Sequence, residues 1–452
     1  MIDPNIYMHE SDKAALKALK AIPGFSQVVK AFMSVWNESQ FRIENMSSRL
    51  RLSEKQMAKY YNMLPPICDK LGIEVPELYL ELNVEANSYT SGDTKPFIVI
   101  TSGLLETMPD ELIPTVLAHE CGHIVCHHVL YSTMGRLILN GLLSYSGSIS
   151  SLISTPLKMA FYYWMRCSEF SADRVATICD GTPNKMVEAC MRFAGYDKDI
   201  TADVNIDEFM KQAIEYKQMV NENKMNKALE VLSFGMATHP LLAVRAYDCN
   251  EWGHSDLFYK VIKYMNSGSN ERTEVPISNG NKYFIGKDCN DVISTLYTYG
   301  FKNINKKKTI QKSLMIQNGQ VVKVSINGNE NFAEGDWYSV DSEVIVVYYE
   351  PETAEEAAIA HAGKIQIPDS SRKYMSRDYK EVVLELNDAG FTNVIAEPWY
   401  VKKSIFNRNN SIDKITIGGL TEFNKGDWFS PDITIRINYQ LIMDDSIKNS
   451  KE

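Results

Sequence analysis

The 452-residue sequence lacks several features that mark whole classes of protein. It has no excess of positive charge, since 47 basic and 57 acidic residues give a formal charge of −10, and nothing attracts nucleic acid electrostatically. Its first ten residues contain no basic segment followed by an apolar run, and so do not resemble a secretory signal. Its eight cysteines form no C-x-x-C pair, which favours a reducing compartment. We therefore expect a cytoplasmic protein that does not bind nucleic acid.

Long apolar runs are also scarce, and one stretch approaches the length of a membrane span. Residues 137–157 carry no charge and are long enough to cross a bilayer. Six serines, two glycines and one proline make the stretch a poor candidate for insertion, and Gly147 divides it into two shorter apolar segments. We expect a buried or lid-forming helical hairpin here. The alternative, an element that contacts a membrane and gives peripheral association, stays open.

What the sequence does contain is an H-E-x-x-H motif within residues 115–128. His119 and His123 are four residues apart on an apolar helical pattern, so their imidazoles lie one above the other and can converge on one metal ion. Glu120 is turned about 100° from His119, beside the ion and not on it. This position suits a carboxylate that deprotonates a metal-activated water. About 0.01 chance matches are expected at this composition, so the motif predicts a zinc hydrolase.

A second pair of acidic residues follows on a helical pattern at 164–176. Glu169 and Asp173 are again four residues apart and share one helix face. A zinc site with two histidines needs one more protein ligand and leaves a position for water. Glu169 is our candidate for that ligand, and Asp173 for the acceptor that orients a ligating histidine. Taken alone, the pair would indicate a solvated acidic face, but the preceding motif favours the metal site.

Two short strands are expected before the zinc helix, at 78–82 and 97–101, because both runs are rich in aliphatic and aromatic residues. A strand in this place often forms the edge of the cleft, to which a peptide substrate adds as another strand. The segment between the two runs supplies our candidates for substrate binding: Asn87, Ser88 and Tyr89. The alternative, that the segment is merely one arm of a hairpin, has equal weight.

Three motifs follow one another along the chain: His-Glu-Cys-Gly-His at 119–123, Ser-Glu-Phe-Ser-Ala-Asp-Arg at 168–174, and Thr-His-Pro at 238–240 followed by Arg245. In this order they resemble the gluzincin metallopeptidases of the HtpX and CAAX prenyl protease family. The resemblance covers roughly residues 10–265. Integral members of that family have several strongly apolar helices, which this sequence lacks, so it resembles the soluble branch.

The resemblance also implies residue roles. It implies one zinc ion per chain, held by three side chains: His119, His123 and Glu169. Glu120 would be the general base and later the proton donor, and Asp173 would support a ligand. His239 with Arg245 would stabilise the oxyanion or position the substrate, a role that requires fixed positive donors. Activity on prenylated or membrane substrates is not implied.

An internal repeat begins beyond residues 266–270, whose sequence Asn-Ser-Gly-Ser-Asn is typical of a linker. Lys287-Asp288 recurs as Arg377-Asp378, and Gly335-Asp-Trp337 recurs as Gly426-Asp-Trp428, so the copies are displaced by 90 or 91 residues. Each copy indicates a helix followed by a few strands. The pattern resembles PASTA modules, which are known from penicillin-binding proteins and bacterial serine/threonine kinases.

These patterns predict an α+β protein. A mostly helical gluzincin metallopeptidase domain with a small β-sheet would precede two small PASTA-like α+β repeats. The expected boundaries are 1–270 for the peptidase domain, 276–350 for the first repeat, 351–371 for a connector and 372–442 for the second repeat.

We expect the chain to be a zinc-dependent metalloendopeptidase that hydrolyses peptide or protein substrates. Its repeats would be available to a protein or ligand partner. The alternative from another class is an inactive or latent metallopeptidase-like protein that acts through those repeats. Metal content combined with a peptide hydrolysis assay separates the two.

Overall fold

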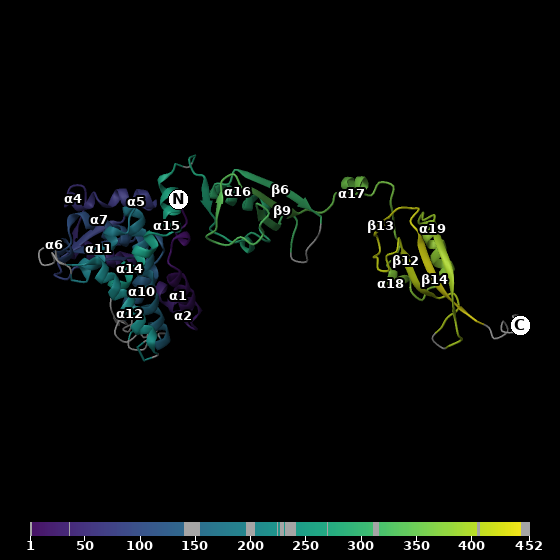
Figure 1. Cartoon of the computed structure of the whole chain (residues 1–452), viewed down its shortest axis with the longest axis horizontal. Coiled ribbons are helices and arrows are strands. Elements are labelled where there is room, and N and C mark those ends of the chain that lie inside the picture. The colour runs from purple at the N-terminus through teal and green to yellow at the C-terminus, as the bar shows by residue number, and fades with distance from the viewer. Residues whose placement is uncertain are drawn as a thin grey trace. The chain divides into compact units, whose positions relative to one another are not determined.

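The computed structural model consists of helices and several small sheets, which confirms the α+β class (Figure 1). Contacts between residues divide the chain into two compact units, Met1–Lys307 with Met315–Tyr348 and Lys308–Leu314 with Tyr349–Glu452. The structure describes the following residues: 2–35, 37–139, 154–195, 204–223, 225–226, 230, 241–268, 270–310, 316–404 and 407–443.

The first unit contains a four-stranded sheet in the order β1-β2-β4-β3. β4 (Phe97–Thr101) is buried at every position, as a continuous apolar run predicts. β2 (Glu77–Glu81) pairs with β4 in parallel, and β3 (Ser88–Ser91) pairs with it antiparallel. β1 (Leu50–Arg51) completes the sheet beside β2. The strand order leaves β3 at one edge of the sheet.

Helices α7 (Ile113–Val125) and α10 (Thr155–Asp180) pack against each other through a close approach at Gly122. A Cβ atom at Gly122 would lie 2.8 Å from the Cα of Ala172, so a side chain there would force the two backbones apart. Pro114 lies in the first turn of α7, where its missing N–H removes no helical hydrogen bond. The contact holds the H-E-x-x-H segment against the middle of α10.

The N-terminal helices α1 (Glu10–Ala21) and α2 (Phe25–Val35) belong to a second apolar cluster, together with α10 and α8 (Val129–Leu139). Figure 1 shows α1 beside α10, and the two helices are in contact. His9 caps α1, because its imidazole accepts a hydrogen bond from the backbone N–H of Ser11 at 3.0 Å. The members of the cluster that are fully buried are Leu19, Val28, Met134, Leu157, Phe161 and Trp164.

Further helices complete the peptidase part of the chain. In it α5 packs on α7, and α14 packs on α10, α11 and α12. Their bounds are α3 (Glu38–Ser48), α4 (Ala58–Tyr61), α5 (Leu64–Leu71), α6 (Ser102–Thr107), α11 (Asn184–Phe193), α12 (Ile206–Glu222), α14 (Leu242–Gly253) and α15 (Asp256–Asn266).

Both C-terminal repeats combine one longer helix with a three-stranded sheet and a separate pair of short strands. In the first repeat, α16 (Cys289–Tyr299) ends at Gly300, whose φ of 108° suits glycine in the reversal after a helix. Its strands are β5 (Glu274–Pro276), β6 (Asn303–Thr309), β7 (Val321–Ile326), β8 (Trp337–Ser339) and β9 (Glu343–Tyr349), in the orders β6-β9-β7 and β5-β8.

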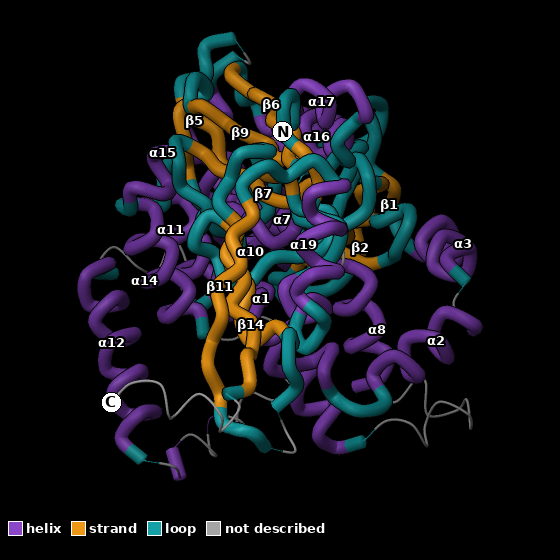
Figure 2. The backbone as a smooth tube through the Cα atoms, turned by 90° about the vertical axis from the view of Figure 1, so that its right-hand side faces the viewer, coloured by secondary structure: helices purple, strands orange, loops and turns teal. Residues whose placement is uncertain are grey.

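The second repeat has the same order of elements. Its helix α19 (Tyr379–Asp388) precedes β11, which runs parallel to β14, while β12 pairs with β14 antiparallel. Figure 2 shows β11 and β14 side by side. The remaining bounds in this unit are α17 (Ala354–Ala360), α18 (Ser371–Tyr374), β10 (Ile365–Gln366), β11 (Val394–Val401), β12 (Ile412–Ile417), β13 (Trp428–Phe429) and β14 (Ile435–Ile442). The domain boundaries expected from the sequence stay predictions.

The apolar stretch 137–157 is only partly described. Residues 140–153 lie outside the described residues, so the hairpin expected there stays a prediction. α8 ends just before them and α10 begins just after them. Among the described residues, no helix combines the length and the apolar character needed to span a membrane.

Candidate metal centre

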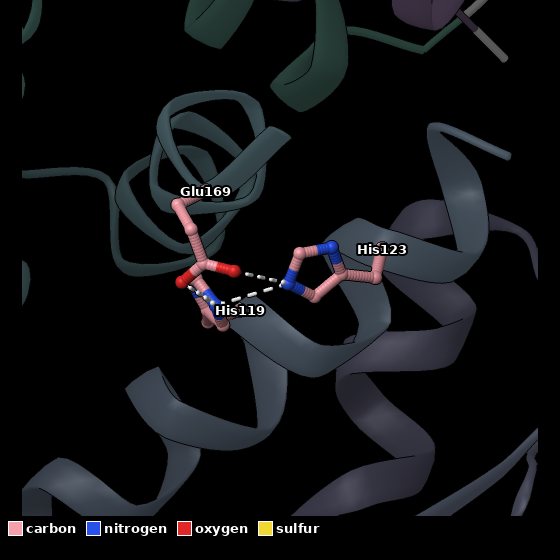
Figure 3. A group of neighbouring side chains, drawn as sticks. All are labelled: His119, His123 and Glu169. Carbon is pink, nitrogen blue, oxygen red and sulfur yellow. Dashed lines mark hydrogen bonds and ion pairs between the residues drawn. The ribbon is translucent and has the colours of Figure 1, made fainter. Parts of the chain in front are cut away.

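Three side chains from two helices meet in the peptidase part of the chain: His119 and His123 of α7 and Glu169 of α10 (Figure 3). All three are buried, and their ligand atoms lie within 4.8 Å of one another. The two Nε2 atoms are 3.2 Å apart. Glu169 Oε2 lies 3.5 Å from His119 Nε2, and Oε1 lies 3.4 Å from His123 Nε2. The structure thus brings together the three residues that the sequence predicts as ligands.

This donor set fits a tetrahedral divalent ion. Bonds of about 2.0–2.1 Å from zinc to nitrogen or oxygen place neighbouring donors about 3.3 Å apart in a tetrahedron. The two imidazole nitrogens are 3.2 Å apart, and each lies 3.4 or 3.5 Å from a different oxygen of the Glu169 carboxylate, which is close to that value. Two imidazoles and one carboxylate also leave a fourth position for water, which is typical of catalytic zinc sites.

A buried aspartate and a buried arginine support this cluster. Asp173 Oδ1 lies 2.7 Å from His119 Nδ1, so the imidazole directs its other nitrogen toward His123 and Glu169. Arg245 donates to Asp173 from Nε at 2.7 Å and from Nη2 at 2.6 Å. Its Nη1 lies 2.9 Å from Glu169 Oε2. Burial raises the pKa of Asp173, but the charge and hydrogen bonds of Arg245, together with those of His119, outweigh burial and lower that pKa below its usual range.

The place of Arg245 differs from the one expected. All three guanidinium nitrogens face the carboxylates of Asp173 and Glu169, so the side chain is engaged on the ligand side and not directed at a substrate. A guanidinium held in this way is suited to binding carboxylates, and less suited to donating to an oxyanion. His239 lies outside the described residues, and its role stays a prediction.

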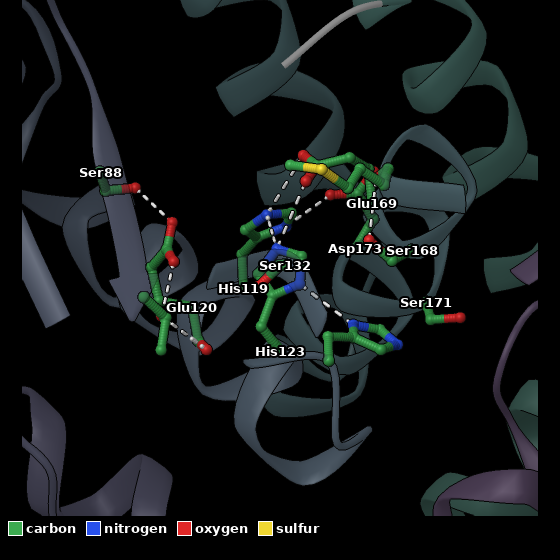
Figure 4. A network of polar contacts seen from close by, with 12 residues as sticks. Ser88, His119, Glu120, His123, Ser132, Ser168, Glu169, Ser171 and Asp173 are labelled. Carbon is green, nitrogen blue, oxygen red and sulfur yellow. Dashed lines mark hydrogen bonds and ion pairs between the residues drawn. The ribbon is translucent and has the colours of Figure 1, made fainter. Parts of the chain in front are cut away.

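Glu120 lies on the other side of the two imidazoles, toward β3 (Figure 4). Its side chain is buried, and both carboxylate oxygens accept hydrogen bonds from hydroxyl groups of that strand. Ser88 Oγ donates to Oε1 at 2.6 Å, and Thr90 Oγ1 donates to Oε2 at 2.7 Å. The two hydroxyls fix the orientation of the carboxylate beside the ligand cluster.

Residues 66–252 match the family model described as peptidase family M48. The matched segment contains the H-E-x-x-H motif, Glu169, Asp173 and Arg245. Residues 66–252 form a peptidase family M48 domain. This match confirms the family resemblance that the motifs indicate.

Relatives of the M48 domain carry names of the same kind. The plastoglobule-localized metallopeptidase 48 of Arabidopsis thaliana chloroplasts is 28% identical over 271 residues, which are 59% of this chain and 78% of the plant protein. A protease HtpX homolog of Nostoc punctiforme is 24% identical over 181 residues, 34% of this chain and 63% of that protein. These names support a metallopeptidase.

Two solved structures are similar to parts of the chain. Ste24p of S. mikatae is 16% identical with a TM-score of 0.27, and the match covers 52% of this chain and 61% of that one. The three-PASTA-domain of a Ser/Thr kinase from Staphylococcus aureus is 17% identical with a TM-score of 0.14, over 38% of this chain and 68% of that one.

β3 is the edge strand of the M48 domain, and every second residue along it turns its backbone N–H and C=O away from β4. In an antiparallel pair, successive residues turn their N–H and C=O groups to opposite sides. The carbonyl of Asn87 accepts a hydrogen bond from the N–H of Thr101 at 3.0 Å, so Asn87 and Tyr89 face β4. The backbones of Ser88 and Thr90 face the outer edge. Of the three residues predicted to bind substrate, Ser88 is the one whose backbone points that way.

The sequence gives no sign of Arg136, a cation of the M48 domain that lies at this outer edge. Its Nη2 donates to the carbonyl of Thr90, and its Cζ lies 5.9 Å from the ring centroid of Tyr89. Glu120 and Glu169 are among the charges that act on its guanidinium. Arg136 belongs to α8, which no motif connects to the zinc helix, and only the fold brings it to β3.

The M48 domain without metal holds a proton on His119. Burial lowers the pKa of His119, but its hydrogen bonds to Asp173 and Glu169 outweigh burial and raise the pKa to about 10. With Nδ1 facing Asp173, the second proton is on Nε2, the nitrogen that a metal would take. Burial lowers the pKa of His123, which keeps that imidazole neutral. Metal binding must therefore displace the proton of His119.

We expect zinc binding to release about one proton per chain near pH 7. Because His119 stays protonated below its raised pKa, the apparent affinity should rise about tenfold per pH unit and level off as the pH passes that value. Calorimetry in buffers of different ionisation enthalpy measures the protons released. An affinity that does not change with pH, with no proton released, would contradict this picture of the metal-free site.

Proposed function

We propose that the chain is a zinc-dependent metalloendopeptidase with Glu120 as its general base. One observation carries the proposal: two imidazoles and one carboxylate meet at tetrahedral spacing, and Glu120 follows the first of these ligands on the same helix. The M48 match and the names of the relatives support peptide bonds as the substrate.

In this proposal each residue around the metal site has a separate role in hydrolysis. A bound zinc ion supplies Lewis acidity, which acidifies water and polarises a carbonyl group. Glu120 takes the proton of the attacking water and passes it to the leaving amine. Ser88 and Thr90 keep its carboxylate in place by their hydroxyl groups. Asp173 holds His119 in the orientation that a ligand needs.

The substrate would bind as an extended strand along the outer edge of β3. The backbones of Ser88 and Thr90 face that edge and lie on the same strand that holds Glu120. Addition of a strand to a sheet edge uses main-chain hydrogen bonds and needs neither end of the peptide. This mode favours an endopeptidase that accepts protein substrates.

Arg136 would mark one end of that binding edge. Its guanidinium already binds the carbonyl of Thr90, so a peptide strand that pairs with β3 must meet it there. In our proposal Arg136, and not Arg245, is the cation that contacts the bound substrate, through a carbonyl group of the peptide.

Arg136→Gln should raise KM by about 10–150-fold and lower kcat less, because a charged hydrogen bond of about 1.5–3 kcal/mol to bound peptide is lost. Zinc content should not change, since the hydrogen bond that the structure gives to the Arg136 guanidinium is to the carbonyl of Thr90 and not to a ligand. Steady-state kinetics with a quenched peptide measure the split between KM and kcat. The matched control is Arg42→Gln, which removes an exposed arginine that pairs with Glu77 at 3.5 Å. An unchanged KM in the Arg136 variant would refute the substrate role.

The test of the proposed function is hydrolysis of an unfolded protein by the full chain. Turnover should disappear with a chelator and return with one equivalent of zinc. If the chain binds one zinc ion and cleaves nothing, the latent binding protein becomes the better account. The cytoplasmic location, and a protein or ligand partner for the repeats, stay proposals.

A further inference from the structure

A second histidine beyond the H-E-x-x-H motif contacts the metal cluster. α7 ends at Val125, and His127 reverses the chain with a φ of 58°. The N–H of His128 then bonds to the carbonyl of His123 at 2.9 Å, which closes the helix end. This turn brings the imidazole of His128 beside that of His123, and their Nδ1 atoms are 3.1 Å apart.

The other nitrogen of His128 faces an aspartate from the N-terminal helix. Asp12 of α1 lies 2.9 Å from His128 Nε2 through its Oδ2 and is completely buried. The same carboxylate accepts hydrogen bonds from Ser171 Oγ at 2.6 Å and from Trp164 Nε1 at 3.0 Å. Burial raises the pKa of Asp12, but the three hydrogen bonds outweigh burial and lower it. Asp12 is therefore an acceptor in all three contacts.

The contacts fix which nitrogen of each imidazole carries a proton. In its neutral form His128 carries its single proton on Nε2 to donate to Asp12, which leaves Nδ1 as an acceptor. That acceptor faces Nδ1 of His123, so His123 carries its proton on Nδ1. The Nε2 of His123 then has a lone pair directed at the cluster with His119 and Glu169.

We propose that Asp12 is a positioning residue of the metal centre, which acts through His128 to hold His123 in its ligating tautomer. This inference rests on the proposed metal site. In this proposal an aspartate orients each of the two histidine ligands. Asp173 contacts His119 directly, and Asp12 acts on His123 through His128. Asp12 precedes residues 66–252, so the M48 domain depends on a helix outside its family match for one ligand.

The segment before Asp12 is fixed to the same helix that carries Glu169. The N–H of His9 donates to Ser171 Oγ at 3.0 Å, and Arg174 Nη1 donates to the carbonyl of Tyr7 at 3.2 Å. Both partners belong to α10, four residues or fewer from Asp173 or Glu169. The N-terminal segment is thus held in register with the ligand helix, as a positioning role requires.

Asp12→Leu should lower zinc affinity by about 10–100-fold, the usual cost of removing a group that orients a ligand. Without Asp12, no carboxylate holds the proton of His128 on Nε2, so the opposite tautomer of both histidines becomes accessible. The dissociation constant is measured by competition with a chromophoric chelator on the full chain. The matched control is Asp180→Leu, which removes a half-buried aspartate of α10 that accepts a hydrogen bond from Thr115 at 2.8 Å, away from the cluster. It should leave zinc affinity within about 3-fold.

A second measurement is independent of the folding of any variant. In the zinc-loaded wild type, nitrogen-15 shifts should show His128 protonated at Nε2 and bare at Nδ1. A proton on Nδ1 of His128, or zinc affinity unchanged in Asp12→Leu, would overturn the inference. Both readouts concern zinc binding alone, so a chain that binds zinc and hydrolyses nothing would refute the proposed function and leave the role of Asp12 to be judged separately.

Discussion

Glu120→Gln should bind zinc as tightly as the wild type and hydrolyse peptides about 10²–10⁴-fold more slowly, the range that a general base contributes. The amide has nearly the same shape as the carboxylate but cannot take a proton from water. The fold should persist, since Ser88 and Thr90 both have hydroxyl groups that can accept as well as donate. Initial rates on a quenched peptide, with zinc measured by mass spectrometry, give both quantities.

The matched control for this variant is Glu106→Gln, at an exposed position of α6. It removes the same charge from the same part of the chain and should leave the rate unchanged. Hydrolysis at the wild-type rate by zinc-loaded Glu120→Gln would remove Glu120 from the mechanism. Loss of zinc as well as activity would instead show that its carboxylate supports the metal.

Arg245→Met should destabilise the metal-free chain by about 3–5 kcal/mol, because it leaves two buried carboxylates without their cation. Asp173 is fully buried and Glu169 nearly so, and Arg245 contacts both within 2.9 Å. The methionine replaces the aliphatic stem of the arginine, so the loss is mainly that of the charge and its hydrogen bonds. Urea unfolding followed by circular dichroism measures the free energy.

Zinc should restore part of this stability, since a bound cation also neutralises Glu169. The comparison variant is Arg42→Met, whose ion pair with Glu77 is exposed on both sides and should contribute less than about 1 kcal/mol. If both variants lose the same free energy of unfolding, the buried guanidinium of Arg245 does not support the cluster.

Much of the site follows from helical spacing. His119, His123 and Glu169 are recognised because a four-residue spacing places ligands on one face, and because two histidines leave one protein ligand to find. The repeats are also predictable from the sequence. The same residue pattern returns after 90 or 91 residues, so both copies are expected to have the same order of helix and strands.

Contacts between residues far apart in the sequence were less predictable. Arg245 was expected at the substrate, but only the packing of α14 on α10 shows that it faces two carboxylates. Asp12 reads as an ordinary surface charge in an amphipathic helix, and its burial depends on a neighbour 116 residues away. The sequence does not separate His128 from its neighbour His127, and the helix end at Val125 decides which of the two turns back toward His123.

The most direct test of the metal centre is anomalous diffraction at the zinc absorption edge from crystals of the zinc-loaded full chain. We predict one strong peak about 2 Å from Nε2 of His119, Nε2 of His123 and the carboxylate of Glu169. A peak held by other side chains, or no peak between the two helices, would contradict the account.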